Sequence, residues 1–133
     1  MVVVDTTVWI DYLRGTENAE TGWLDRELQR QRLGLTDLIL CEVLQGIRDQ
    51  RAFARVRADL LKFQVFEAGG RELAIAAAQN YRELRERGYT VHKTIDCLIA
   101  TLCMRGRHEL LHRDRDFDCF EKLLGLQVVH AAG

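Results

Sequence analysis

The sequence contains no proline, and it has no apolar run as long as the roughly 18 residues that a membrane-spanning helix needs. Its formal net charge is only −1, which argues against a globally basic clamp for nucleic acid without excluding local basic patches. The first acid, Asp5, comes too early for the apolar region of a signal peptide. We therefore expect a cytoplasmic protein with no membrane partner.

The sequence also lacks a C-x-x-C pair, although it has four cysteines, Cys41, Cys97, Cys103 and Cys119. Each cysteine has apolar neighbours, where a thiol usually behaves as a small core side chain. Without an export signal, we expect all four to be reduced and structural rather than bridged or catalytic.

The 133 residues are 47% hydrophobic and 29% charged, which is typical of a globular chain with a substantial core. There is no internal repeat, low-complexity tract or linker. The sequence therefore predicts a single domain over residues 1–133.

Short apolar segments alternate with longer amphipathic ones. Strands are predicted at residues 2–4, 33–35, 64–67, 109–112 and 126–129. Helices are predicted at residues 7–14, 17–31, 37–47, 50–62, 70–87, 95–104 and 116–124, with Thr94 as a candidate cap. This alternation predicts an α/β fold with a mainly parallel sheet of four or five strands and helices on both faces.

Acidic residues follow the predicted strands or sit in the helices beside them. They are Asp5, Glu42, Asp96, Asp114 and Asp116. Singly, each has an ordinary explanation: Asp5 and Asp116 as helix caps, Asp96 as a complement to a helix dipole, and Glu42 as part of a solvated face.

Parallel sheets of this kind place ligands at the carboxyl ends of their strands, where these acids would converge. Two unit charges about 4 Å apart repel by roughly 4 kcal/mol at an effective dielectric of 20, so a converged cluster needs protons or a cation. Oxygen ligands without His or Cys suit Mg²⁺ or Mn²⁺ rather than Zn²⁺. Such a site is suited to phosphate substrates.

The same residues carry a family resemblance. The ordered motifs are VVDTTVWID around Asp5, CEVLQG around Glu42, TIDCLIA around Asp96, and HRDRDF around Asp114 and Asp116. Together they resemble the PIN-domain ribonucleases and, more narrowly, the VapC toxins of bacterial VapBC toxin–antitoxin pairs. The resemblance covers essentially the whole chain.

This resemblance implies a PIN-like fold and Mg²⁺- or Mn²⁺-dependent endonucleolytic cleavage of RNA, by a metal-activated water that attacks in line and leaves a 3′-hydroxyl. It implies a type II toxin that cleaves RNA to inhibit translation and growth, with tRNA or rRNA as the expected target and messenger RNA as the alternative. It also implies a VapB-type antitoxin as partner, and a homodimer. Asp5, Glu42, Asp96 and Asp114 are the implied catalytic and metal-binding residues, with Asp116 as a fifth metal ligand. Many relatives carry Asn in place of Asp114, so one or two metal ions remain open.

Substrate contacts are predicted at residues next to these acids, namely Thr6, Lys93, Thr94 and Arg115. The two threonines have an equally ordinary role as helix caps. Arg113 is a further candidate for RNA. We expect Trp9 in the core and His112 as a structural residue at a strand end.

Two other functions compete with this one. A receiver-like phosphoryl-transfer domain would need an acid pair at the end of its first strand, but Asp5 stands alone there. A catalytically inert PIN-like module that binds RNA or protein would retain the fold without turnover. No acid of the implied set is missing, but intact ligands do not prove turnover.

Overall fold

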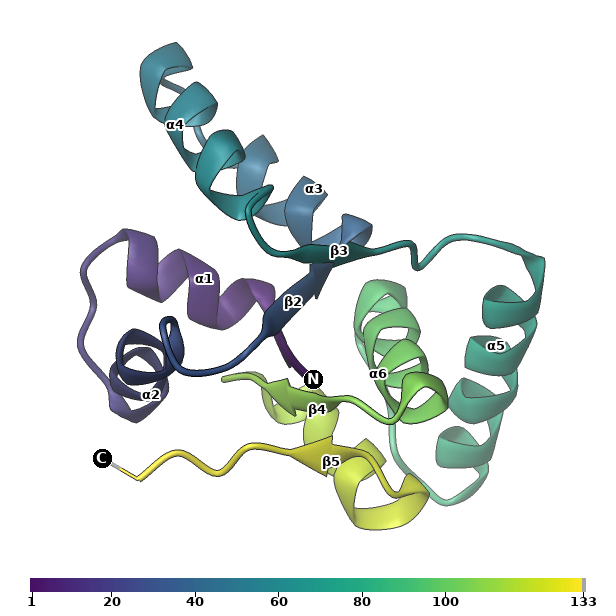
Figure 1. Ribbon diagram of the computed structural model, residues 1–133. Coiled ribbons are helices and arrows are strands. Elements are labelled where there is room, and N and C mark those ends of the chain that lie inside the picture. Colours follow the sequence, from purple (N-terminus) through teal and green to yellow (C-terminus); the bar gives the residue numbers. More distant parts are fainter. Residues whose placement is uncertain (133) are drawn as a thin grey trace.

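The computed structural model describes residues 1–132 and is built around five parallel strands (Figure 1). They are β1 (Val2–Val4), β2 (Leu33–Thr36), β3 (Gln64–Phe66), β4 (Glu109–Leu111) and β5 (Gln127–Val128). Their order in the sheet is β3-β2-β1-β4-β5, and every neighbouring pair is parallel. In the centre, Val3 lies opposite Gly34 of β2 and Leu110 of β4. This confirms the predicted α/β fold.

Within residues 1–132, six α-helices connect the strands: α1 (Thr6–Leu13), α2 (Ala19–Glu27), α3 (Asp37–Gln45), α4 (Gln50–Leu60), α5 (Arg71–Glu86) and α6 (Thr94–Gly106). The chain steps outward from β1 to β3 and then returns to the other side of β1. Because parallel crossovers are right-handed, the helices before and after this return lie on opposite faces. Figure 1 shows α1 and α2 on one side of the sheet and α5 and α6 on the other.

Buried side chains are concentrated on β1, whose three valines are all buried, and on α6. Helix α5 packs on α6 through its alanine-rich side, where Ala77 is buried and its carbonyl accepts a hydrogen bond from Cys97 Sγ at 3.0 Å. Small side chains allow this close approach. The packing of α5 on α6 therefore fixes the position of α6, which carries Asp96.

Several boundaries differ from the predicted ones. The helix predicted at 17–31 spans only Ala19–Glu27: Asn18 and Thr21 form a capping box at its start, and the thin apolar stripe buries only Leu24 among its large side chains. The helix predicted at 116–124 is divided into a 3-10 turn, η1 (Arg115–Phe117), and a π turn, η2 (Phe120–Leu124). Thr94 is the first residue of α6 and not its cap, because Lys93 takes the N-cap position without a side-chain bond.

One cysteine also differs from expectation. All four thiols are free, and Cys97, Cys103 and Cys119 are buried as predicted. Cys41 is exposed, because α3 buries Ile39 and Val43, and a residue midway between two positions four apart faces away from them. Among residues 1–132, no helix is both long enough and apolar enough to cross a membrane.

Candidate metal centre

The acidic residues gather where the sheet order reverses, between β1 and β4. Asp5 follows β1 directly, and its N–H donates to the carbonyl of Leu111, the last residue of β4, at 2.9 Å. Asp114 follows β4 three residues later, and Asp96 lies in the first turn of α6. This is the crevice at which open parallel sheets bind ligands.

Asp5 is both a helix cap and a buried acid. Its Oδ2 accepts hydrogen bonds from Thr7 N at 3.1 Å and Thr7 Oγ1 at 2.7 Å, which caps α1. Its Oδ1 is buried and has no hydrogen-bond partner. Burial raises the pKa of Asp5 to about 6, aided by the charge of Glu42 and opposed by the Thr7 bonds. Capping therefore uses one oxygen and leaves the other for a ligand.

Asp96 is the second buried acid, with only 3% of its surface exposed. Its Oδ2 is also buried without a partner. Burial raises the pKa of Asp96 to about 8, and the neighbouring charges of Asp5 and Asp114 add to the effect. The metal-free protein thus holds a proton here under conditions where an ordinary aspartate is ionised.

Asp114 and Asp116 lie beside Asp96, so that one oxygen from each of the three carboxylates falls within 4.8 Å of the others. Asp114 Oδ1 accepts a bond from Asp116 N at 2.9 Å, and its Oδ2 lies 3.4 Å from Lys93 Nζ. Burial alone would raise the pKa of Asp114, but these contacts and a hydrogen bond with Asp96 outweigh it and lower the pKa. The ionised form is therefore favoured at Asp114 and disfavoured at its buried neighbour Asp96.

Glu42 approaches the same crevice from α3. Its Oε1 accepts a hydrogen bond from Thr6 Oγ1 at 2.7 Å, and its charge acts on Asp5. The structure therefore brings Asp96, Asp114 and Asp116 into one tight group, with Asp5 and Glu42 adjoining it. The hydroxyl of Thr6, predicted to contact substrate, is engaged with Glu42.

The residues of this centre fit a hard divalent cation. The fit rests on Asp5 Oδ1 and Asp96 Oδ2, two buried carboxylate oxygens that lack any hydrogen-bond partner. Buried polar atoms of this kind are costly unless something satisfies them. All candidate ligands are carboxylate oxygens, the donors that cations of the Mg²⁺ and Mn²⁺ type prefer.

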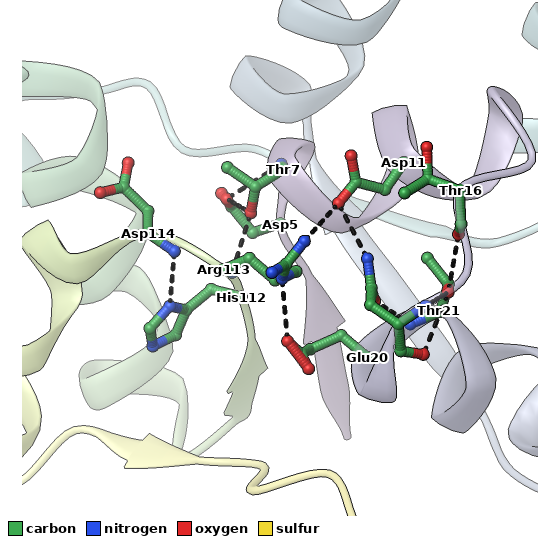
Figure 2. Close-up of polar contacts among 10 residues, drawn as sticks. Asp5, Thr7, Asp11, Thr16, Glu20, Thr21, His112, Arg113 and Asp114 are labelled. Carbon is green, nitrogen blue, oxygen red and sulfur yellow. Dashed lines mark hydrogen bonds and ion pairs between the residues drawn. The ribbon is translucent and has the colours of Figure 1, made fainter. Parts of the chain in front are cut away.

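A supporting network behind the acids was missed by sequence reasoning (Figure 2). Thr7 Oγ1 donates to Asp5 Oδ2 and accepts the N–H of Arg113 at 3.0 Å, which ties α1 to the segment after β4. His112 Nδ1 accepts the N–H of Asp114 at 3.1 Å, consistent with the structural role expected of this histidine. The only sequence signal for Thr7 was its place two residues after a capping aspartate.

Arg113, which the sequence offered as a further candidate for RNA, is ion-paired within this network. Its guanidinium reaches Asp11 Oδ2 at 3.1 Å and Glu20 Oε1 at 3.0 Å (Figure 2). The side chain therefore points toward α1 and α2 and fixes the segment that carries Asp114.

Replacing Thr7 by valine is expected to weaken Mn²⁺ binding by about 10- to 100-fold, the usual effect of removing a residue that orients a metal ligand. The valine removes one donor to Asp5 and leaves the N–H of Arg113 without its acceptor. Titration calorimetry with Mn²⁺ measures the change. The exposed Thr16, replaced by valine in the same way, is the control. Equal affinities for Thr7→Val and wild type would show that the hydroxyl does not position Asp5.

The fold and the site together define an α/β domain with a cluster of acidic residues at its topological switch point. Residues 2–123 match the model of the PIN domain, and the chain belongs to the PIN domain family. Within it, the chain is similar to the VapC ribonuclease Mb1587 of Mycobacterium bovis and to ribonuclease VapC11 of Mycobacterium tuberculosis. Each is 30% identical over 130 residues, which cover 96% of this chain and 97% of the relative.

Solved structures share the same fold at lower identity. VapBC2 from Rickettsia felis, described as bound to a DNA fragment from its promoter, superposes with a TM-score of 0.76 at 13% identity and covers 97% of this chain and 98% of its own. FitAcB from Neisseria gonorrhoeae gives a TM-score of 0.75 at 18% identity, with 98% and 97% covered. VapC20 of Mycobacterium tuberculosis, described as a toxin that cleaves the sarcin-ricin loop, gives 0.65 at 17% identity, with 90% and 94% covered.

Proposed function

We propose that this chain is a divalent-metal-dependent endoribonuclease that acts as the toxin of a type II toxin–antitoxin pair. The relatives of similar length are named as VapC ribonucleases. The observation that carries the proposal is the pair of unpartnered buried oxygens on Asp5 and Asp96, at the centre of a complete acidic set. An inert binding module would have no need to keep this costly arrangement.

In this proposal, Asp5 and Asp96 are the principal ligands of one Mg²⁺ or Mn²⁺ ion. Glu42, Asp114 and Asp116 complete its surroundings directly or through water. When bound, such an ion polarises a phosphoryl oxygen and lowers the pKa of a water molecule. The expected reaction is in-line hydrolysis of the phosphodiester, which leaves a 3′-hydroxyl.

The chain's own residues orient these groups. Thr6 holds Glu42 Oε1, which leaves Oε2 to face the ion or to accept a proton from the attacking water. Thr7 holds Oδ2 of Asp5 and leaves the buried Oδ1 without a hydrogen-bond partner. His112 and Arg113 set the position of the segment that carries Asp114.

RNA phosphates are proposed to lie along the rim next to these acids. Lys93, Thr94 and Arg115 are all exposed there. Thr94 begins α6, where the positive end of the helix dipole favours an anion. An exposed arginine beside an acidic centre supplies the charge that draws an RNA backbone toward it.

The substitution Arg115→Gln is expected to flatten the dependence of log affinity on log salt by roughly 0.7, as for the loss of one phosphate contact on a single strand. Binding of a metal-free sample to a labelled RNA at several salt concentrations measures the slope. Arg51→Gln, an exposed arginine on α4, is the control and should keep the wild-type slope. Identical slopes for all three proteins would remove Arg115 from the RNA contacts.

Cleavage of total RNA by the purified protein tests the function itself. Reactions contain Mg²⁺ or Mn²⁺, with EDTA as the comparison, and sequencing of the new ends locates each cut. Discrete fragments that require the metal are expected. Metal binding without any cleavage would favour the inert module, and cleavage that survives EDTA would overturn the metal-dependent mechanism.

We expect the target to be a structured RNA, either tRNA or rRNA, and the site of action to be the cytoplasm. The VapC20 structure, whose description names a ribosomal RNA loop, supports this class of target by analogy. The sequenced ends distinguish the two classes directly.

A VapB-type antitoxin is the proposed partner, because one structural neighbour is described as a toxin–antitoxin complex and two others as VapBC structures. The groove between α1, α3 and α4 is the proposed seat for an antitoxin segment. Its volume is about 360 Å³, and its apolar lining includes Ile10, Leu13, Val43, Ile47 and Val56. It shares helices α1 and α3 with the acidic centre, since Asp5 caps α1 and Glu42 lies on α3. Trp9 is not part of it, because Trp9 is buried against Phe63 as a core residue.

The groove and the oligomeric state can be tested together. Size-exclusion chromatography with light scattering should show a homodimer of the isolated chain. The same measurement after mixing with a VapB-type antitoxin should show a larger complex. If no VapB-type antitoxin forms a complex with the chain, both the antitoxin and its seat in the groove are removed from the proposal.

A further inference from the structure

The five acids of the centre are not equally available to a cation. On one side, Asp5 Oδ1 and Asp96 Oδ2 are buried without partners. On the other side, every oxygen of Asp114 and Asp116 already has a partner from the chain. The centre therefore has one side whose buried oxygens lack partners and one side whose oxygens are all in contact with donors from the protein.

The partners on the satisfied side come largely from two consecutive residues. His92 binds Asp116 twice, with its ring Nδ1 3.0 Å from Oδ1 and its backbone N–H donating to Oδ2 at 3.3 Å. Lys93 places its ammonium 3.4 Å from Asp114 Oδ2. Since Lys93 is the N-cap of α6, the start of the helix that positions Asp96 also positions His92 and Lys93.

The Lys93 ammonium is a cation held among several anions. Its nearest partner is the carboxylate of Asp114, and the carboxyl groups of Asp96 and Glu42 lie near enough to act on it. The side chain is still 58% exposed, so the ammonium stands at the mouth of the centre rather than sealed inside it. It carries three N–H donors, which allows contact with Asp114 and with an incoming phosphate oxygen at once.

We propose that the Lys93 ammonium takes the place of a second divalent cation, so that the centre binds a single divalent ion on the Asp5–Asp96 side. This inference rests on the proposed metal-dependent function and specifies how many divalent ions the centre binds. A second divalent ion at Asp114 and Asp116 would have to displace the ammonium and break the contacts of His92. Lys93 then supplies, beside the substrate phosphate, the positive charge that a second metal would supply.

Counting bound Mn²⁺ ions tests this directly, without reference to activity. Free Mn²⁺ is measured by electron paramagnetic resonance during titration of wild type, Lys93→Gln and Arg115→Gln. Arg115→Gln removes the same charge from an exposed residue beside the same acids, one that forms no ion pair within residues 1–132. Lys93→Arg, which keeps the charge, is the second control. Thermal melting of each variant verifies that it is folded.

We expect one bound Mn²⁺ per chain for wild type, Arg115→Gln and Lys93→Arg, and two for Lys93→Gln. Two ions in wild type, or one in Lys93→Gln, would overturn the inference and leave the proposed function standing. Two ions in Arg115→Gln would also overturn it, because a general loss of charge would then suffice. No Mn²⁺ binding by folded wild-type protein would overturn both this inference and the proposed function.

Discussion

Asp96→Asn is expected to lower metal-dependent RNA cleavage by at least about 100-fold. The reason is that Asp96 contributes one of the two unpartnered buried oxygens of the centre, and even outer residues of metal sites usually cost 10- to 100-fold when removed. The amide keeps the shape of the side chain but cannot carry the negative charge that holds a cation. The measurement is the rate of fragment formation from a defined RNA under saturating Mn²⁺.

Asp118→Asn is the matched control, because Asp118 is an exposed aspartate only two residues past Asp116 and outside the tight acidic group. It should cleave at close to the wild-type rate. Wild-type cleavage by folded Asp96→Asn would refute the assignment of Asp96 as a principal ligand. Equal losses in both variants would point to a general electrostatic effect rather than to a specific site.

The metal-free protein is expected to become less stable as the pH rises from about 4 to about 8.5. Burial raises the pKa of Asp5 to about 6 and that of Asp96 to about 8, both from 3.8. Because both values are raised in the folded state, this contribution to the free energy of unfolding is complete below about pH 4. It is lost as the pH passes about 6 for Asp5 and about 8 for Asp96.

The size of this effect is large for a domain of 133 residues. For Asp5 alone, the difference between 3.8 and about 6 corresponds to about 3 kcal/mol. Such a change shifts the melting temperature by roughly 10 °C. Melting temperatures of the EDTA-treated protein across this pH range provide the measurement.

Two comparisons isolate the acidic centre from other titrating groups. Asp96→Asn should flatten the pH dependence above about pH 6 and melt higher than wild type at about pH 8.5, because its amide has no charge to bury. Mn²⁺ should stabilise wild type more at about pH 8.5 than at about pH 5.5, since it binds the ionised carboxylates. A metal-free wild type that is more stable at the higher pH, with Asp96→Asn following the same curve, would contradict the raised pKa values.

Sequence reasoning was most successful where local signals and burial agreed. The valines of β1 were recognisable as a buried strand, and the helix now labelled α6 began within one residue of its predicted start. It failed where a signal was weak or depended on neighbours. The thin apolar stripe of α2 did not reveal that Asn18 and Thr21 would start the helix later, and that it would stop at Glu27. Nothing local predicted that the segment after Asp114 would break into two short turns.

The candidate site also has features that the sequence predicted and features that it did not. The positions of Asp5, Asp96 and Asp114 were readable from sequence, because acids directly after strands or at helix starts reach one edge of a parallel sheet. The engagement of Lys93 with Asp114 and of Arg113 with Asp11 was not readable. These pairs join residues 21 and 102 positions apart, and a sequence does not reveal which of its many arginines and lysines will meet which acid.

By itself, the sequence determined the α/β alternation, the parallel sheet and the set of acids at its edge, because these follow from hydrophobic periodicity and from the geometry of parallel strands. Only the tertiary structure decided which carboxylate oxygens lack partners and which are already satisfied. That distinction depends on burial and on side chains brought together from α1, α6 and the segment after β4. Burial raises the pKa values of Asp5 and Asp96, and contacts with residues distant in the sequence provide the hydrogen-bond partners of Asp114 and Asp116. The chemistry of the centre therefore arises only in the folded chain.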